Sequence, residues 1–294
     1  MQAHQRSWGI KQWVEYLRDK ETPVLPATRA TLVALQQAAE EVRESLSARD
    51  LVDIVYADPY LALKLLRRAE ERRTRQLGHD TTTPLGAILQ TGYDELQEIV
   101  AASRLSEGML PGCHACERRA VLAATLARAW AAQRVDVVPD EVAMAALLAE
   151  TGELLLWHFA PEMTDKEVAI YQWNERYWAL QHRPSEIEFT FRQLTMALAE
   201  SWGLPHLIIM LIKGTDTPRA NLARLGHDAA KLVIGEAAPE QLVPLLQEVK
   251  KMLPTQALVT LAEPLPLSEP QRERLLAAIA AAEQQAVSGV PSAD

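Results

Sequence analysis

Apolar residues recur at helical spacing along most of the chain. In the first clear helix, Leu32, Leu35 and Val42 fall on one stripe, as they do in an amphipathic helix. Leu and Ala dominate the long periodic stretches, and both residue types favour helix over strand. The sequence holds no β-branched runs bounded by Gly or Asn-Gly turns, which would signal hairpins. The pattern therefore predicts an all-α fold.

Start and stop signals divide the first half into short helices. Asp58-Pro59 and Thr83-Pro84 each place a capping side chain before a proline at the first helical position. Gly92 supplies a stop signal after the second of these starts. Four or five short helices are therefore expected by residue 103, after a short amphipathic helix within residues 1–20.

The second half carries longer helices. They are expected at roughly 117–133, 140–158, 165–181, 186–202 and 206–213, and then at 221–235, 240–252 and 269–286. A Ser185-x-x-Glu188 capping box opens the fourth of them, and Gly203 closes it. Residues 287–294 are expected to be frayed.

The charge balance argues against polyanionic partners. The formal net charge is −9 and the isoelectric point is about 5.4, so most of the surface repels nucleic acid and anionic membranes. Residues 1–20 carry charges among their apolar positions, unlike a signal peptide, and we expect no uninterrupted apolar stretch long enough to span a bilayer. We therefore expect a soluble, cytoplasmic protein that binds neither nucleic acid nor membrane.

Several motifs follow one another in a specific order. In the front half, Leu25-Pro26 precedes the first helix, Asp58-Pro59 opens another, and the segment Pro84–Gly92 precedes a third. In the back half, a helix from 117 is followed by Ala145–Leu156 and then by Leu198–Pro205. Together these motifs, between about residues 23 and 235, resemble the HDOD family of bacterial proteins, which are relatives of the HD phosphohydrolases.

The resemblance implies two packed helical subdomains, the second HD-like, with additional C-terminal helices. We expect an N-terminal helix and linker in 1–22, the N-terminal HDOD helical subdomain in 23–110, the HD-like helical subdomain in 111–235, and C-terminal helices with a frayed tail in 236–294.

The positions that the resemblance assigns to the HD metal ligands carry other side chains. In HD phosphohydrolases, His and Asp residues hold one or two divalent metals that activate water against a phosphoester. The resemblance places Arg119 at the first His, Ala149-Glu150 at the His-Asp pair, Phe191 at a further His, and Lys213-Gly214 at a later His pair. Ala has no ligand atom, and Arg or Lys adds positive charge where a cation should bind. We therefore expect no enzymatic activity, no cofactor and no metal at this position.

Two carboxylates lie at or near the altered positions. Because the counterparts of Arg119 and Glu150 meet at one metal in active relatives, we expect the guanidinium to pair with this carboxylate and replace the bridging metal. Glu150 and Glu153 are three residues apart and share a helix face, as a general acid and base would. Solvated carboxylates on a helix surface are the favoured interpretation of this second pair.

Two short motifs have the appearance of metal or redox sites. Cys113 and Cys116 have the spacing of a zinc or redox pair, but a zinc site would need two more ligands and no second pair exists. We interpret them as ordinary cysteines at a helix start. His79-Asp80 and His227-Asp228 each follow a Gly. We interpret both dipeptides as surface or capping residues, the second of them beginning or interrupting a late helix.

Four aromatic residues crowd one segment of a chain that is only 5% aromatic. They are Tyr171, Trp173, Tyr177 and Trp178. Core or inter-subdomain packing is the favoured interpretation. The alternative is an exposed anchor for a partner, because Trp and Tyr dominate interface hot spots.

The HDOD resemblance implies a non-catalytic signalling or regulatory module that binds a separate signalling protein, with room for a small ligand in the former metal cleft. The candidate ligand or interaction residues are Arg119, Glu150, Lys213, Trp173, Tyr177 and Trp178. One alternative is a nucleotide-binding sensor in which Arg119 and Lys213 hold a phosphate. The other is a metal-dependent phosphohydrolase with rebuilt ligands. Each of these functions is compatible with an oligomer.

Overall fold

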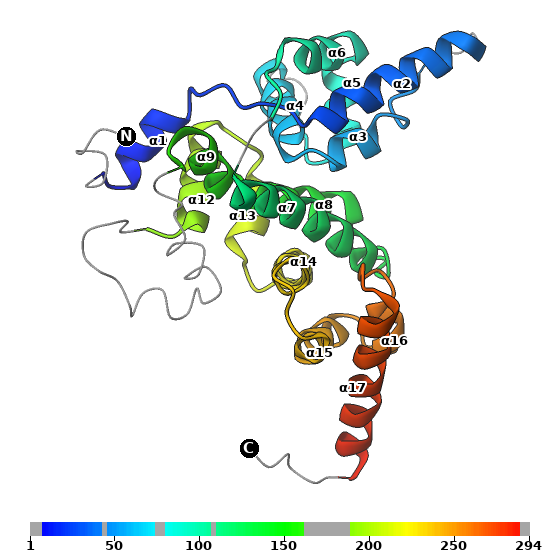
Figure 1. The fold of residues 1–294 in the computed structure, drawn as a ribbon. Coiled ribbons are helices and arrows are strands. Elements are labelled where there is room, and N and C mark those ends of the chain that lie inside the picture. Colours follow the sequence, from blue (N-terminus) through cyan, green and yellow to red (C-terminus); the bar gives the residue numbers. More distant parts are fainter. Residues whose placement is uncertain (1–7, 43–45, 74–79, 107–109, 162–188, 289–294) are drawn as a thin grey trace.

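A computed structural model describes residues 8–42, 46–73, 80–106, 110–161 and 189–288 (Figure 1). Helices account for the secondary structure of these ranges, apart from a parallel bridge between Val24 and Leu105. The predicted all-α fold is therefore confirmed. The expected helix 165–181, with Trp173, Tyr177 and Trp178, lies outside the described residues. The Ser185 capping box that was expected to open the helix 186–202 also lies outside them.

The N-terminal helices gather at one end of the molecule (Figure 1). They are α2 (Pro26–Val42), α3 (Val52–Tyr56), α4 (Pro59–Arg72), α5 (Pro84–Thr91) and α6 (Tyr93–Ala102). The predicted starts at Asp58 and Thr83 are confirmed, because both side chains accept hydrogen bonds from backbone N–H groups in the first turn of their helix. Asp58 also accepts hydrogen bonds from Leu25 N and Thr28 Oγ1, at 2.8 and 2.7 Å. One buried carboxyl therefore fixes the start of α4 against the start of α2.

In the described residues, six helices form the HD-like part. They are α7 (Pro111–Ala131), α8 (Pro139–Leu148), α9 (Thr151–Phe159), α12 (Phe191–Ser201), α13 (His206–Lys213) and α14 (Pro218–Ile234). Helix α7 lies between α8 and α14 and packs along both. At Gly226 of α14, an added Cβ would lie 2.7 Å from the backbone oxygen of Ala123 in α7. Glycine therefore permits the close approach of these two helices.

The first helix packs on the HD-like part and not on the N-terminal subdomain. Helix α1 (Ile10–Leu17) lies beside α9 and α12 (Figure 1). Trp13 and Leu17 are fully buried in a cluster with apolar side chains of both helices. Trp202 Nε1 also donates to the carbonyl oxygen of Arg18 at 2.8 Å. These contacts confirm the amphipathic helix predicted within residues 1–20.

The C-terminal helices continue the core of the HD-like part. They are η4 (Pro239–Gln241), α15 (Leu242–Met252), α16 (Leu258–Ala262) and α17 (Glu269–Ser288). Trp130 in the last turn of α7 donates a hydrogen bond to the carbonyl oxygen of Leu261, and Arg134, just beyond this helix, donates one to that of Met252. One hydrophobic cluster includes buried residues from α2 to α17, so three of the four expected parts, all except the N-terminal helix and linker, share a continuous core.

Several expected helices have different bounds in the structure. The helix expected at 140–158 is divided into α8 and α9, because Glu150 is the N-cap of a new helix with φ −85° and ψ 0°. The helix expected at 186–202 begins only at Phe191. Its start is fixed by a capping box between Thr190 and Gln193, which the sequence reading overlooked.

The expectation that no apolar stretch could span a membrane needs correction. Pro139–Phe159 is long and apolar enough to do so by length and composition. However, 83% of its most apolar window is buried inside the protein. This segment is therefore a core helix pair in the described fold.

Candidate functional site

A buried cluster of one guanidinium and two carboxyls joins α7 to the start of α9. Arg119 Nε and Nη2 lie 3.2 Å from Oε1 and Oε2 of Glu150, respectively. Arg119 Nη2 also donates to Glu153 Oε2 at 2.6 Å. Both glutamate side chains are only 4% exposed, and that of Arg119 is 13% exposed. The expected pairing of Arg119 with Glu150 is confirmed, whereas the interpretation of Glu150 and Glu153 as solvated surface carboxylates is wrong.

The two carboxyls respond differently to the same surroundings. Burial alone would raise the pKa of Glu150, but Arg119, His227 and Lys231 together outweigh this effect and hold the pKa below its usual value. Burial raises the pKa of Glu153, and the neighbouring Glu150 carboxylate reinforces that effect against Arg119. The Glu150 carboxylate therefore balances the charge of the Arg119 guanidinium, while the Glu153 carboxyl tends to keep its proton. This division limits the uncompensated charge in a dry site.

Helix α12 holds the start of α9 in place. Thr195 Oγ1 donates to the carbonyl oxygen of Ala149 at 3.1 Å and accepts from Gly152 N at 2.9 Å. An added Cβ at Gly152 would lie 2.7 Å from the backbone oxygen of Phe191. Phe191, which the resemblance places at a metal-ligand His, thus contributes backbone packing beside Glu150.

His227 of α14 is a member of this cluster that the sequence reading missed. Its Nδ1 lies 3.2 Å from Glu150 Oε1 but has no hydrogen-bond partner of good geometry. Burial lowers the pKa of His227 to about 3, despite the neighbouring Glu150 carboxylate, so the ring is neutral. The expected surface or capping role for His227 is wrong, because the residue lies inside α14.

The sequence does contain a signal that His227 lies on a buried face of its helix. Ala223, Gly226 and Ala230 form a stripe of small buried residues at helical spacing, and His227 is adjacent to it. Small residues at such spacing allow another helix to approach closely, and Gly226 contacts α7 in this way. The other dipeptide differs: Asp80 is exposed and pairs with Arg73, and His79 lies outside the described residues.

Lys213 does not take part in the cluster. It is the last residue of α13 and is exposed, and no hydrogen bond or ion pair joins it to Arg119 or Glu150 within the described ranges. The nearby cations that act on Glu150 are Arg119 and Lys231 of α14. Of the six candidate residues, the structure therefore brings together Arg119 and Glu150.

A family model places the chain among known proteins. Residues 25–218 match the model described as the HDOD domain. The chain belongs to the HDOD family. This match covers the helices α2 to α13 and therefore includes Arg119, Glu150 and Glu153, whereas His227 lies beyond it. Among curated proteins, none matches the sequence significantly.

Two solved structures resemble this HDOD protein over most of their length. One is the MmoQ response regulator from Methylococcus capsulatus str. Bath, with 20% identity, a TM-score of 0.58, and coverage of 88% of this chain and 99% of that one. The other is a virulence factor from Campylobacter jejuni subsp. jejuni, with 17% identity, a TM-score of 0.64, and coverage of 90% and 98%. At these identities the similarity shows a shared fold.

The geometry of the Arg119 cluster restricts its chemistry. Single ligand atoms of Cys116, Glu150 and Glu153 lie within 4.8 Å of one another, so these three residues alone would be able to hold a metal. The Arg119 guanidinium already contacts both carboxyls. In this HDOD domain a permanent cation of the protein therefore stands where a metal would need the same oxygens.

Proposed function

We propose that this HDOD domain is a non-catalytic regulatory module of the bacterial cytoplasm that acts by binding a separate signalling protein. The observation that carries the proposal is the buried contact of Arg119 with Glu150 and Glu153. An HD phosphohydrolase needs metal-activated water at this place. Here a guanidinium fixed on α7 occupies the carboxylate oxygens and repels a second cation.

The energetics of the pair support a structural role for it. Arg119 is always charged, so no change of pH within the physiological range frees the carboxylates for a metal. Removing the guanidinium would leave buried charge uncompensated, which is costly. The residues around it, including Cys116 and His227, are packed against the pair.

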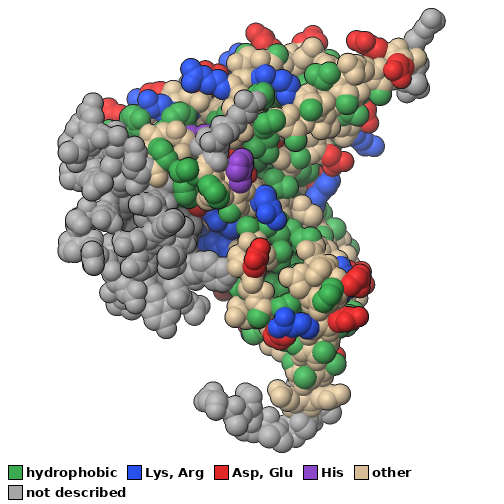
Figure 2. Space-filling view, in the orientation of Figure 1, with side chains coloured by type: hydrophobic (Ala, Val, Ile, Leu, Met, Phe, Trp, Pro, Cys, Tyr) green, Lys and Arg blue, Asp and Glu red, His purple; other side chains and the backbone are tan. Residues whose placement is uncertain are grey.

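Two further facts favour a signalling role. The chain belongs to the HDOD family, and the protein from Methylococcus that shares its fold is described as a response regulator. The visible face in Figure 2 mixes acidic and basic side chains, and the net charge is −9. These features favour a protein partner over a nucleic acid.

The two rival functions have less support. A phosphate sensor built on Arg119 and Lys213 would need both cations at one place, but Arg119 is buried in carboxyl contacts and Lys213 is exposed on α13. A phosphohydrolase with rebuilt ligands would need Glu150 and Glu153 free of Arg119. We therefore retain the binding module as the proposed function.

The proposal is tested with purified protein in two assays. Hydrolysis of p-nitrophenyl phosphate and bis(p-nitrophenyl) phosphate is measured with Mn²⁺ or Mg²⁺ and is expected to stay at the buffer background. Hydrolysis that requires metal and is lost in Glu150→Gln would contradict the non-catalytic proposal.

Binding is tested by affinity purification of the tagged protein from its native organism, followed by reconstitution with each captured protein. A complex of fixed stoichiometry in size-exclusion chromatography is expected with a signalling protein. If none of the captured proteins forms such a complex, the proposed mode of action is wrong.

A further inference from the structure

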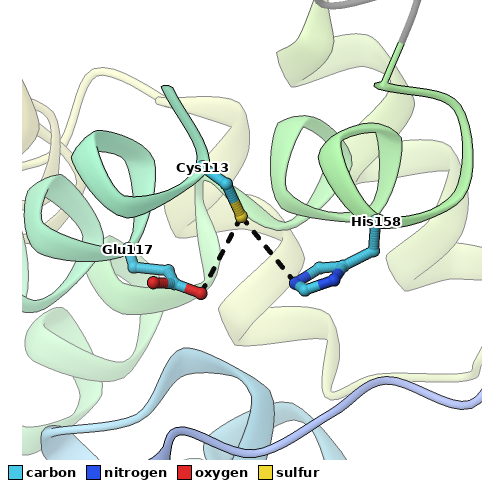
Figure 3. A group of neighbouring side chains, drawn as sticks. All are labelled: Cys113, Glu117 and His158. Atoms are coloured by element: carbon cyan, nitrogen blue, oxygen red, sulfur yellow. Dashed lines mark hydrogen bonds between the residues drawn. The ribbon is translucent and has the colours of Figure 1, made fainter. Parts of the chain in front are cut away.

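A second polar cluster lies between α7 and α9, beyond the Arg119 site. Cys113 and Glu117 are one helical turn apart on α7, and His158 lies in the last turn of α9 (Figure 3). Cys113 Sγ lies 3.8 Å from both Glu117 Oε1 and His158 Nε2. Figure 3 shows the three side chains converging on the space between the two helices.

The close approach of the two helices creates this convergence. At Gly112, an added Cβ would overlap the ring of Trp157. Only a residue without a side chain therefore allows α9 to pack so near the first turn of α7. Because His158 directly follows Trp157, the same approach carries its imidazole to the Cys113 thiol.

The spacing of the three ligand atoms fits a small divalent metal. One atom from each of Cys113, Glu117 and His158 lies within 4.8 Å of the other two. Zinc bonds of about 2.0–2.3 Å place neighbouring ligand atoms of a tetrahedron roughly 3.3–3.8 Å apart. Two of the measured separations are 3.8 Å, so only small side-chain movements would close the site.

The charge of the cluster also favours a cation. Glu117 is buried, and its carboxyl accepts hydrogen bonds from the hydroxyls of Tyr60 and Ser106, each at 2.8 Å. Its other near partner is His114 Nδ1 at 3.0 Å. None of these three groups carries a permanent positive charge. Glu117 therefore differs from Glu150 and Glu153, which already contact a guanidinium.

We propose that Cys113, Glu117 and His158 bind one Zn²⁺ ion. Thiolate, carboxylate and imidazole are the ligand types that zinc prefers. On binding, the Cys113 thiol would lose its proton to solvent as the sulfur–zinc bond forms. The Tyr60 hydroxyl now lies within hydrogen-bond distance of two of the ligand atoms, Glu117 Oε1 at 2.8 Å and His158 Nε2 at 2.7 Å, and it would release both atoms to the metal.

The site would connect two parts of the molecule. Tyr60 belongs to α4 of the N-terminal subdomain, whereas the three ligands belong to α7 and α9 of the HD-like part. Zinc bound here would therefore act at the junction between α4 and these two helices. This proposal does not depend on the proposed regulatory function, since it concerns different residues.

Titration of the full-length, metal-free protein with Co²⁺ tests the site, because a Co²⁺–thiolate bond gives a charge-transfer absorption in the near ultraviolet. We expect one equivalent of Co²⁺ to produce the band and Zn²⁺ to abolish it by competition. The band should be absent in Cys113→Ser and strongly weakened in Glu117→Gln and His158→Gln.

Cys116→Ser is the matched control, since Cys116 is a buried thiol on the same helix whose neighbour is Glu150. This variant should keep the band. Absence of the band in the wild-type protein would overturn the proposal. Loss of the band in Cys116→Ser with retention in Cys113→Ser would also overturn it, and would assign the metal to Cys116 instead. Circular dichroism of each variant checks that it is folded.

Discussion

Arg119 on α7 contacts Glu150 at the start of α9 through two nitrogen–oxygen pairs, each 3.2 Å apart. This contact crosses the place that the HDOD resemblance assigns to a metal. It is buried, and it includes Glu153 as a second carboxyl partner. The resulting ion pairs between side chains of the protein connect α7 to α9.

Removing one partner of this pair should cost more than removing both. In Arg119→Ala, Glu150 and Glu153 remain buried without their guanidinium, so unfolding free energy should fall by about 3–5 kcal/mol. The double variant Arg119→Ala with Glu150→Ala should therefore be less destabilised than Arg119→Ala alone. Urea denaturation of the four proteins measures this coupling.

Arg128 provides a matched control on the same helix. Its Nε lies 2.9 Å from Asp140 Oδ1, but its side chain is 42% exposed. Arg128→Ala should therefore lower the unfolding free energy by no more than about 1 kcal/mol. Two results would contradict the importance of the buried pair for stability. One is an equal loss of unfolding free energy in Arg119→Ala and Arg128→Ala, and the other is additivity of the changes caused by Arg119→Ala and Glu150→Ala.

His227 should make the protein sensitive to mild acid. Its folded pKa of about 3 lies below the unfolded value of about 6.5. The neutral ring therefore contributes stability that is full above about pH 6.5 and is lost as the pH falls toward 3. The charged groups that act on the ring are Glu150, Lys231, Arg119 and Arg192.

The measurement compares unfolding free energy at about pH 7 and about pH 5. His227→Gln should lose less stability than the wild-type protein across this interval, because glutamine does not titrate. His206→Gln, which changes an exposed imidazole at the start of α13, should behave as the wild type does. Identical pH dependence in the wild type and His227→Gln would argue against burial of a neutral ring.

Much of the fold could be predicted from local sequence signals. The caps at Asp58 and Thr83 depend on contacts within one helical turn, which a local pattern specifies. The division between α8 and α9 was missed because apolar residues continue across it. The backbone on either side of Glu150 is held by Thr195 of α12, a contact that no local pattern specifies. Likewise, Glu117 and His158 lie far apart in the sequence, so their meeting depends on how α7 packs against α9.

Gly226 should be intolerant of even the smallest side chain. In an open helix, Gly→Ala stabilises by about 1 kcal/mol. Here the new Cβ would lie 2.7 Å from the backbone oxygen of Ala123 and 2.9 Å from the Cβ of Ala127, so α14 would have to move away from α7. We expect Gly226→Ala to lower the unfolding free energy by about 1–3 kcal/mol. Thermal denaturation shows whether Gly226→Ala stabilises or destabilises the protein. A raised midpoint would contradict the close packing of α14 against α7.

The most direct test of whether Arg119 has taken the place of the metal is a crystal of the protein grown or soaked with Mn²⁺, with anomalous diffraction recorded at the manganese edge. Replacement by the guanidinium predicts no anomalous peak between Glu150 and Glu153, with Arg119 still in contact with both carboxyls. A manganese ion bound to these two carboxylates, with the Arg119 side chain displaced, would contradict it and would restore the phosphohydrolase alternative.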